Sequence, residues 1–214
     1  MLHNAAMERF DVINGITEEA LAAAVSALRA GRVVLYPTDT QYALGVDAFS
    51  NNAVDRLYVL KGRESNKPTH AMVAGVGMAK RYVIWNDTAE KIAAKFLPGP
   101  FTIILPKRGE FMTGIAREIG TFGVRIPADE VSRALARAFD GAITATSANR
   151  SGMMPQSSVG AIVGQLGDAA KDIFVLDAGI LPARAPSTVV EIRDGKLTLL
   201  REGPIPFGDL QALV

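Results

Sequence analysis

The sequence contains no cysteine and only two histidines, His3 and His70. The absence of cysteine excludes disulfide bonds, thiolate zinc sites and cysteine nucleophiles. Two histidines are too few for a multi-histidine metal site, and they do not favour a catalytic triad. Any chemistry must therefore rest on Lys, Arg, Ser, Thr, Asn and carboxylate side chains.

Long apolar segments and a nucleotide-binding phosphate loop are also missing. No run approaches the ~20 apolar residues that a membrane-spanning helix needs. Residues 1–10 include Glu8 and Arg9 where a signal peptide would have its apolar core. No GxxxxGK[ST] motif occurs, and the segment 75–80 predicts only a turn before a short helix. We therefore expect a cytoplasmic protein without a P-loop.

Charge of one sign is not in excess either. The chain has 23 basic and 22 acidic residues, a formal net charge of +1. No overall field then draws it to nucleic acid or membranes, so affinity for RNA would need a local patch. The length of 214 residues and the apolar fraction of 49% are those of one globular domain.

Helical and strand patterns mix along the chain without strict βαβ alternation. Thr17 predicts the N-cap of the first helix, and Asp87 with Glu90 three residues later resembles a capping box. Asp194-Gly195 predicts the type I′ turn of a C-terminal hairpin. The mixture favours an α/β domain with a twisted mixed sheet over a doubly wound nucleotide fold. The predicted helices are 18–29, 52–60, 87–96, 130–139 and 159–166; the predicted strands are 33–36, 101–105, 123–126, 142–145, 173–176, 188–192 and 196–200.

Two polar stretches follow predicted strands. Residues 36–42 place Thr38, Asp39 and Thr40 at a strand end, where open sheets bind ligands, although such residues also form turns that bond their own backbone. Residues 144–152 gather hydroxyls, an amide and a glycine, which can hold phosphate oxygens or simply turn the chain. Both interpretations stay open for each stretch.

Two further stretches have the same ambiguity. Lys61, Arg63 and Lys67 form either a phosphate clamp or cations that complement a helix C-terminus. Residues 186–188 and 201–204 are either part of a polar site or merely a strand start and a strand exit. His70 is expected to be a packed or exposed histidine rather than a ligand.

Taken in order and spacing, these stretches resemble the YrdC/TsaC family of L-threonylcarbamoyladenylate synthases. The similarity extends from about residue 15 to 205 and implies a single YrdC-like domain over residues 1–214. It also implies a twisted mixed sheet, surrounding helices and a large concave basic cavity. The segments that carry it are Tyr36–Gly45, Lys61–Arg63, Leu97–Thr102, Gly123–Pro127, Thr146–Gly152, Pro186–Val190 and Arg201–Gly203.

The resemblance implies a nucleotidyltransferase that converts L-threonine, bicarbonate and ATP, with Mg²⁺, into threonylcarbamoyl-AMP and pyrophosphate. The product would feed threonylcarbamoyladenosine formation on tRNA with partner proteins, and contact with tRNA or double-stranded RNA is a further expectation. The metal ligands are left open. The residues that the resemblance assigns are a catalytic tetrad of Lys61, Arg63, Ser147 and Asn149; ATP contacts at Arg63, Lys67, Thr121, Ser147 and Arg201; and threonine contacts at Thr40, Arg125, Ser187 and the backbone near Ala145.

Physical chemistry is consistent with this assignment. Attack of a carbamate on an α-phosphate develops negative charge on phosphoryl oxygens, which needs positioned cations more than a dedicated base. Arg125 could bind the threonine carboxylate through two parallel hydrogen bonds.

The chain departs from the family pattern at several positions. Ala43 replaces a glycine, Glu64 a proline, Met72 a histidine near threonine, and Pro155 a serine near the nucleotide. Two alternatives therefore stay open: a divergent paralogue without this activity, and a non-catalytic RNA-binding or ribosome-maturation factor.

Overall fold

The computed structural model of the protein describes residues 7–64, 69–109, 113–116 and 120–214. Its α-helices are α1 (Glu18–Arg29), α2 (Asn51–Lys61), α3 (Val76–Ala79), α4 (Asp87–Phe96), α5 (Glu130–Phe139), α6 (Val159–Leu166) and α7 (Phe207–Gln211), and its short 3-10 helices are η1 (Gly114–Ala116) and η2 (Gly167–Ala170). Its strands are β1 (Glu8–Asp11), β2 (Val34–Tyr36), β3 (Ala43–Gly45), β4 (Ala71–Met72), β5 (Phe101–Pro106), β6 (Thr121–Arg125), β7 (Ile143–Thr144), β8 (Thr146–Ser147), β9 (Phe174–Asp177), β10 (Thr188–Arg193) and β11 (Lys196–Arg201). The predicted α/β class is confirmed.

Side-chain caps explain where the longer helices begin. The Thr17 hydroxyl accepts a hydrogen bond from the Ala20 amide at 3.2 Å, as the sequence predicts. For α4 the predicted cap was one residue too late, because Asn86 Oδ1 accepts from the Ala89 amide at 2.8 Å. Asp87 instead lies in the first turn, where its charge favours the positive end of the helix dipole.

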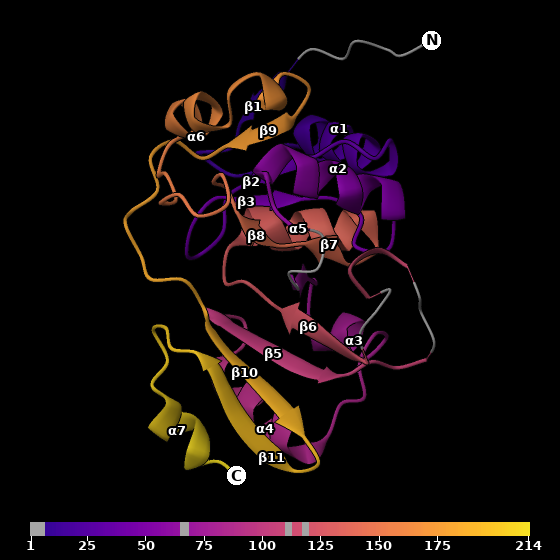
Figure 1. The fold of residues 1–214 in the computed structure, drawn as a ribbon, viewed down its shortest axis with the longest axis vertical. Helices are drawn as coiled ribbons and strands as arrows, with labels where there is room; N and C mark the ends of the chain where they lie inside the picture. The colour runs from indigo at the N-terminus through magenta and orange to yellow at the C-terminus, as the bar shows by residue number, and fades with distance from the viewer. Residues whose placement is uncertain (1–6, 65–68, 110–112, 117–119) are drawn as a thin grey trace.

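The strands divide into two sheets rather than the one sheet expected. The five-stranded sheet has the order β1-β9-β2-β3-β8, and the six-stranded sheet has the order β11-β10-β5-β6-β4-β7. In Figure 1 the five-stranded sheet lies in the upper half of the molecule, and β5, β6, β10 and β11 lie in the lower half.

The predicted strand 142–145 is the point where the chain passes between the two sheets. β7 pairs antiparallel with β4 of the six-stranded sheet, whereas β8 pairs antiparallel with β3 of the five-stranded sheet. Tyr36 in β2 also joins the sheets, because its buried hydroxyl donates to the Thr144 carbonyl at 2.8 Å. A single predicted strand is therefore two short strands with different partners.

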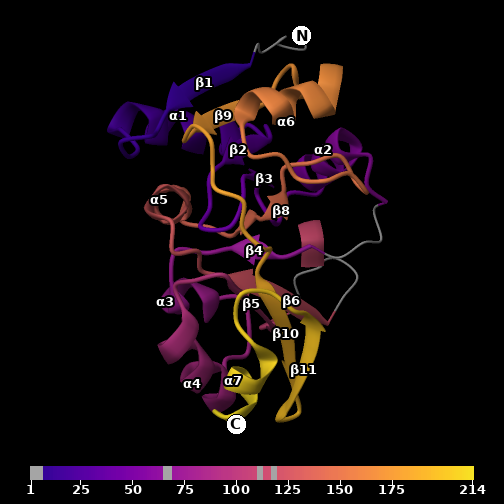
Figure 2. The same cartoon turned by 90° about the vertical axis from the view of Figure 1, so that its left-hand side faces the viewer.

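Helices cover both faces of the five-stranded sheet. Alternate residues of β2 face opposite sides, so Val34 and Tyr36 belong to one apolar cluster with α1 and α5 residues. Leu35 belongs to the other cluster, with residues of α2 and α6. Figure 2 shows α3, α4 and α7 gathered beside the six-stranded sheet.

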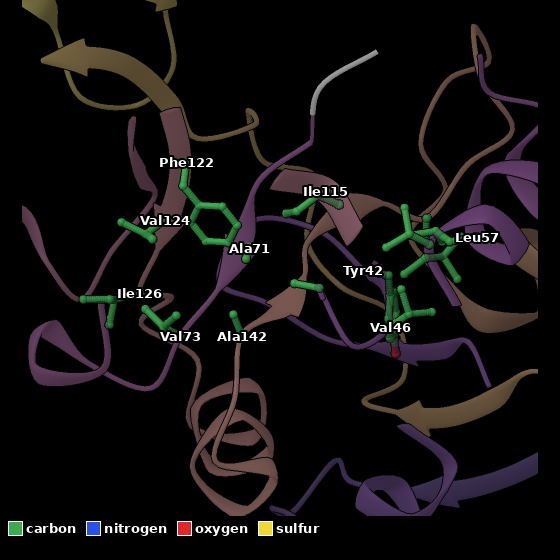
Figure 3. Close-up of a cluster of buried hydrophobic side chains, with 14 of the residues drawn as sticks. Tyr42, Val46, Leu57, Ala71, Val73, Ile115, Phe122, Val124, Ile126 and Ala142 are labelled. Carbon is green, nitrogen blue, oxygen red and sulfur yellow. The ribbon is translucent and has the colours of Figure 1, made fainter. Parts of the chain in front are cut away.

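One apolar cluster extends through both sheets. It includes Val46 and Leu57 near the five-stranded sheet and Phe122 and Val124 from β6. Figure 3 shows these side chains, with Ala71 and Ala142 lying between the two groups. This shared core fixes the relative positions of the loops at the sheet junction.

Gly45 allows the close approach of β3 to that junction. A Cβ added there would lie 2.6 Å from the Tyr36 ring and 2.8 Å from the Thr144 carbonyl oxygen. We therefore expect Gly45→Ala to lower the free energy of unfolding by ~3 kcal/mol, because a packed core cannot absorb the methyl group. Urea unfolding measures the change.

The matched control is Gly164→Ala in α6, where an added Cβ meets no atom within 4 Å. This substitution should leave stability unchanged or raise it by ~0.5–1 kcal/mol. Equal unfolding free energies for the two variants would contradict the tight junction.

Candidate functional site

A cavity of about 490 Å³ lies at the junction of the two sheets. This size is typical of a small-molecule site. We call it the central cavity. Its lining comes from the loop between β2 and β3, the residues before β4, the end of β6, the β7–β8 crossing and the segment between β9 and β10. The lining residues are Thr38, Thr40, Gln41, Tyr42, Ala43, Arg63, Thr69, His70, Arg125, Ala145, Thr146, Ser147, Met154, Pro155, Arg184, Pro186, Ser187 and Arg201.

Four arginines, Arg63, Arg125, Arg184 and Arg201, contribute to this lining. Within the described parts of the chain, no Asp or Glu belongs to it. Burial lowers the pKa of Arg201, and the neighbouring charge of Arg125 lowers it further. Guanidinium groups gathered in this way favour an anionic ligand, particularly a carboxylate or a phosphate.

Arg125 is held by a buried carboxylate. Its Nη2 lies 2.5 Å from Asp39 Oδ1, and the two side chains are 8% and 10% exposed. Arg125 Nε and Asp39 Oδ2 have no hydrogen-bond partner among the described residues. The pair therefore fixes the guanidinium at the cavity wall, and at least one N–H group of Arg125 remains without a hydrogen-bond partner among the described residues.

The loop that contains Asp39 is both a self-bonded turn and part of the cavity wall. The Thr38 hydroxyl donates to the Gln41 carbonyl at 2.6 Å and accepts from the Gln41 amide at 3.2 Å. Thr40 is buried and its hydroxyl lies 3.1 Å from that of Thr38. Thr40 nevertheless lines the cavity, so the two interpretations of this stretch are compatible.

The chain continues from β8 into a loop that the side chains of Lys61 and Asn149 hold by hydrogen bonds. Lys61 Nζ donates to the carbonyls of Ser147 and of Asn149, the latter at 2.8 Å. The Ser147 hydroxyl donates to Asn149 Oδ1, and Asn149 Nδ2 donates to the Met153 carbonyl at 2.7 Å. Three of the four tetrad residues are thus in direct contact, and Ser147 faces the cavity.

Burial, together with a smaller contribution from the positive charge of Arg63, lowers the pKa of Lys61 to about 7. In the unfolded chain the ammonium has its ordinary pKa of 10.5. Between these values the unfolded state binds a proton that the folded state lacks, so stability from this group rises with pH. We expect the stability of the natural protein relative to Lys61→Met to increase from pH 7 to 9, by up to about 1.4 kcal/mol per pH unit.

Denaturant unfolding at several pH values measures this difference. Lys91→Met, at an exposed position of α4, controls for loss of a lysine elsewhere. Parallel pH profiles for the natural protein and Lys61→Met would show that the ammonium is not desolvated.

Arg201 joins β11 to the start of β10. Its Nε donates to the Ser187 carbonyl at 2.9 Å, and its Nη2 donates to the Ser187 hydroxyl at 3.0 Å. The Ser187 hydroxyl also lies 3.0 Å from that of Thr102. The 186–188 and 201–204 stretches, which lie at the open end of the β10–β11 hairpin, therefore form one hydrogen-bonded wall.

The structure brings most of the residues predicted for the site together. Lys61 and Asn149 lie behind the loop rather than among the described lining residues. Lys67 lies outside the described residues. Thr121 lines a second cavity of about 400 Å³, which shares Thr69, His70 and Arg201 with the central cavity. The predicted residues that line the central cavity are Thr40, Arg63, Arg125, Ala145, Ser147, Ser187 and Arg201.

His70 and Arg184 line the cavity although the sequence analysis did not assign them. The sequence predicts a packed or exposed histidine at position 70, whereas the structure places His70 at the cavity wall. Met72 is buried in the apolar cluster beneath α1 and α5. Nothing in the local sequence around Arg184 distinguishes it from an ordinary loop arginine.

The described residues contain no group of three or more His, Cys, Asp or Glu that could hold a metal ion. Among the described helices, none has the length and apolar character to cross a membrane.

Comparison with known proteins is consistent with this geometry. The family profile of Sua5/YciO/YrdC, described as telomere recombination, matches residues 26–203. A putative threonylcarbamoyl-AMP synthase of Methanocaldococcus jannaschii is 37% identical over 180 residues, 84% of each chain. A threonylcarbamoyl-AMP synthase of Pyrococcus abyssi is 30% identical over 93% of this chain and 58% of its own.

A solved structure adds a likeness in three dimensions. The crystal structure of P. abyssi Sua5 complexed with L-threonine has a TM-score of 0.87 and 29% identity, covering 96% of this chain and 60% of that chain. The present chain thus spans about three fifths of these Pyrococcus proteins.

Proposed function

Because this chain belongs to the Sua5/YciO/YrdC family, we propose that it is a threonylcarbamoyl-AMP synthase. Such an enzyme converts L-threonine, bicarbonate and ATP into threonylcarbamoyl-AMP and pyrophosphate. The observation that carries the proposal is the central cavity, where four arginines and several hydroxyls converge without an acidic side chain among the described lining residues. Such a lining suits two anionic substrates bound side by side.

For threonine, Arg125 provides the cation that the carboxylate needs. Asp39 holds its guanidinium from one side, so the remaining N–H groups are oriented before the ligand binds. Thr40 and Ser187 line the same cavity and supply hydroxyls for the threonine side chain, beside the backbone at Ala145. Preorganised polar groups of this kind favour a substrate with a matching hydroxyl.

For ATP, Arg63, Arg201 and Ser147 supply donors for the phosphates. Thr121 lies in the adjoining second cavity, which gives the nucleotide room beyond the phosphates. Lys67 is also a proposed ATP contact, although it is not among the residues that the structure describes. Arginine forks and hydroxyls bind phosphoryl oxygens through charge-assisted hydrogen bonds.

The reaction follows from positioning. The amino group of threonine combines with bicarbonate to give a carbamate and water, and a carbamate oxygen then attacks the α-phosphorus of ATP. The new P–O bond replaces the bond to pyrophosphate, which leaves with its electron pair. Negative charge on the phosphoryl oxygens is stabilised by the fixed guanidinium groups. This transfer of an adenylyl group would make the protein a nucleotidyltransferase.

Mg²⁺ fits this scheme only as a companion of the nucleotide. The described cavity wall provides arginines and hydroxyls, and the carboxylate of Asp39 is paired with Arg125. Mg²⁺ commonly binds substrate phosphates with few protein ligands and several waters. The ion would therefore arrive on ATP and neutralise part of the triphosphate charge.

The product would supply threonylcarbamoyl groups for tRNA modification through partner proteins. Incubation with ATP, bicarbonate and L-threonine, with each omitted in turn, tests the activity by pyrophosphate release. We expect release only when all three are present. A protein that binds RNA but releases no pyrophosphate would instead be the RNA-binding alternative, and one that does neither would be the inactive paralogue.

A further inference from the structure

His70 lies beside a glycine of the neighbouring strand, which leaves room for its side chain. It precedes β4, and its carbonyl accepts a hydrogen bond from the Ala145 amide at 2.9 Å. The parallel register that pairs Ala71 with Val124 brings His70 opposite Gly123. A Cβ at Gly123 would lie 2.9 Å from the His70 Cβ, so the glycine leaves room for the base of the His70 side chain.

The imidazole lies at the junction of two cavities. His70, Thr69 and Arg201 line both the central cavity and the second cavity. A ligand that extends from one cavity into the other must therefore pass beside this ring.

One ring nitrogen is buried without a partner. His70 Nε2 has no hydrogen-bond partner among the described residues and almost no exposure to water. Leaving a buried polar atom unpaired costs free energy, and such atoms in native structures commonly meet a ligand or an ordered water. The lining position makes a cavity ligand the natural partner.

Three arginines act on the charge state of the ring. Burial, together with smaller contributions from the positive charges of Arg125, Arg201 and Arg63, lowers the pKa of His70 to about 3. The imidazole is therefore neutral near pH 7, and one of its nitrogens carries a hydrogen. The arginines attract an anionic ligand, whose oxygen atoms accept hydrogen bonds. An Nε2 that carries the hydrogen can therefore donate to such an oxygen.

We propose that His70 is a substrate-binding residue whose Nε2–H donates a hydrogen bond to an anionic oxygen held by the cavity arginines. The oxygen belongs either to the carboxylate of the amino acid or to a phosphate of the nucleotide. This assignment rests on the proposed function. It adds a hydrogen bond from a neutral side chain to the charged contacts that the arginines of the central cavity provide.

Nuclear magnetic resonance of the full chain tests the contact, because the sequence contains only His3 and His70. The spectrum of His3→Gln identifies the His70 ring signals. We expect them to shift when either L-threonine or ATP is added alone, while the His3 signals stay in place. A shift with threonine identifies the carboxylate, and a shift with ATP identifies a phosphate.

Two substitutions separate binding from packing. His70→Leu removes the donor and should raise the KM of the ligand identified by resonance about tenfold or more, with a smaller change in kcat. His70→Gln places an amide nitrogen near the Nε2 position and should restore most of the loss.

Ring signals that do not move while other protein signals respond to both ligands would overturn the assignment. Equal losses in His70→Leu and His70→Gln would do the same, because they would indicate a packing role. If neither ligand moves any signal of the natural protein, the proposed function fails and this assignment fails with it.

Discussion

Replacement of Arg63 by alanine should reduce turnover by ~10²–10³, the usual consequence of losing one fixed charge-stabilising group at a reacting phosphoryl centre. Arg63 follows the C-terminus of α2, where Gly62 adopts a left-handed conformation with φ of 58°. Its amide donates to the Tyr58 carbonyl at 2.9 Å. The backbone there is anchored, so the substitution removes charge from the cavity wall without removing a structural hydrogen bond of the main chain.

Steady-state pyrophosphate release measures the effect, and thermal unfolding checks that the variant remains folded. Arg193→Ala provides the matched control, since Arg193 is exposed at the end of β10 and does not line the central cavity. Equal turnover in the two variants would place the phosphoryl centre elsewhere.

Arg125→Lys should raise the KM for threonine about 10- to 100-fold, with a much smaller effect on the KM for ATP. Lysine keeps the positive charge beside Asp39, so the buried carboxylate is not left alone. It loses the planar fork that can bind a carboxylate through two parallel hydrogen bonds, worth about 1.5–3 kcal/mol. Kinetics with each substrate varied in turn separates the two constants.

Arg81→Lys is the corresponding control, because Arg81 forms an exposed pair with Asp140 at 2.9 Å. It should leave both constants unchanged. A larger effect of Arg125→Lys on ATP than on threonine would reverse the assignment of substrates within the cavity.

Local features of the fold could be predicted from the sequence. The Thr17 cap and the Asp194-Gly195 turn depend on residues within a few positions of one another, and both are confirmed. The hairpin turn has positive φ at both residues, 51° and 73°, as a type I′ turn requires.

Long-range features could not be predicted in the same way. The passage from β7 to β8 depends on pairing with strands some 70 to 100 residues away, and no local pattern marks it. The Arg125–Asp39 pair joins residues 86 positions apart, so no local pattern could predict that these two side chains meet.

In the candidate site, too, the sequence predicts local features but not contacts between distant residues. The local sequence leaves Lys61 as either part of a phosphate clamp or a helix-end cation, whereas in the structure it is 2% exposed and donates to two carbonyls of the Ser147 loop. His70 gave no signal in the sequence, because its place beside the cavity depends on Gly123 in a neighbouring strand. The family resemblance assigns these residues to one site. Only the fold distinguishes the residues that line the central cavity from those that lie behind it.

The most direct test of the proposed function is mass spectrometry of the nucleotide product formed with ¹³C-labelled bicarbonate. We expect a threonine-dependent adenylate that carries one ¹³C atom and appears together with pyrophosphate. An unlabelled adenylate, or pyrophosphate release that does not require threonine, would contradict the account.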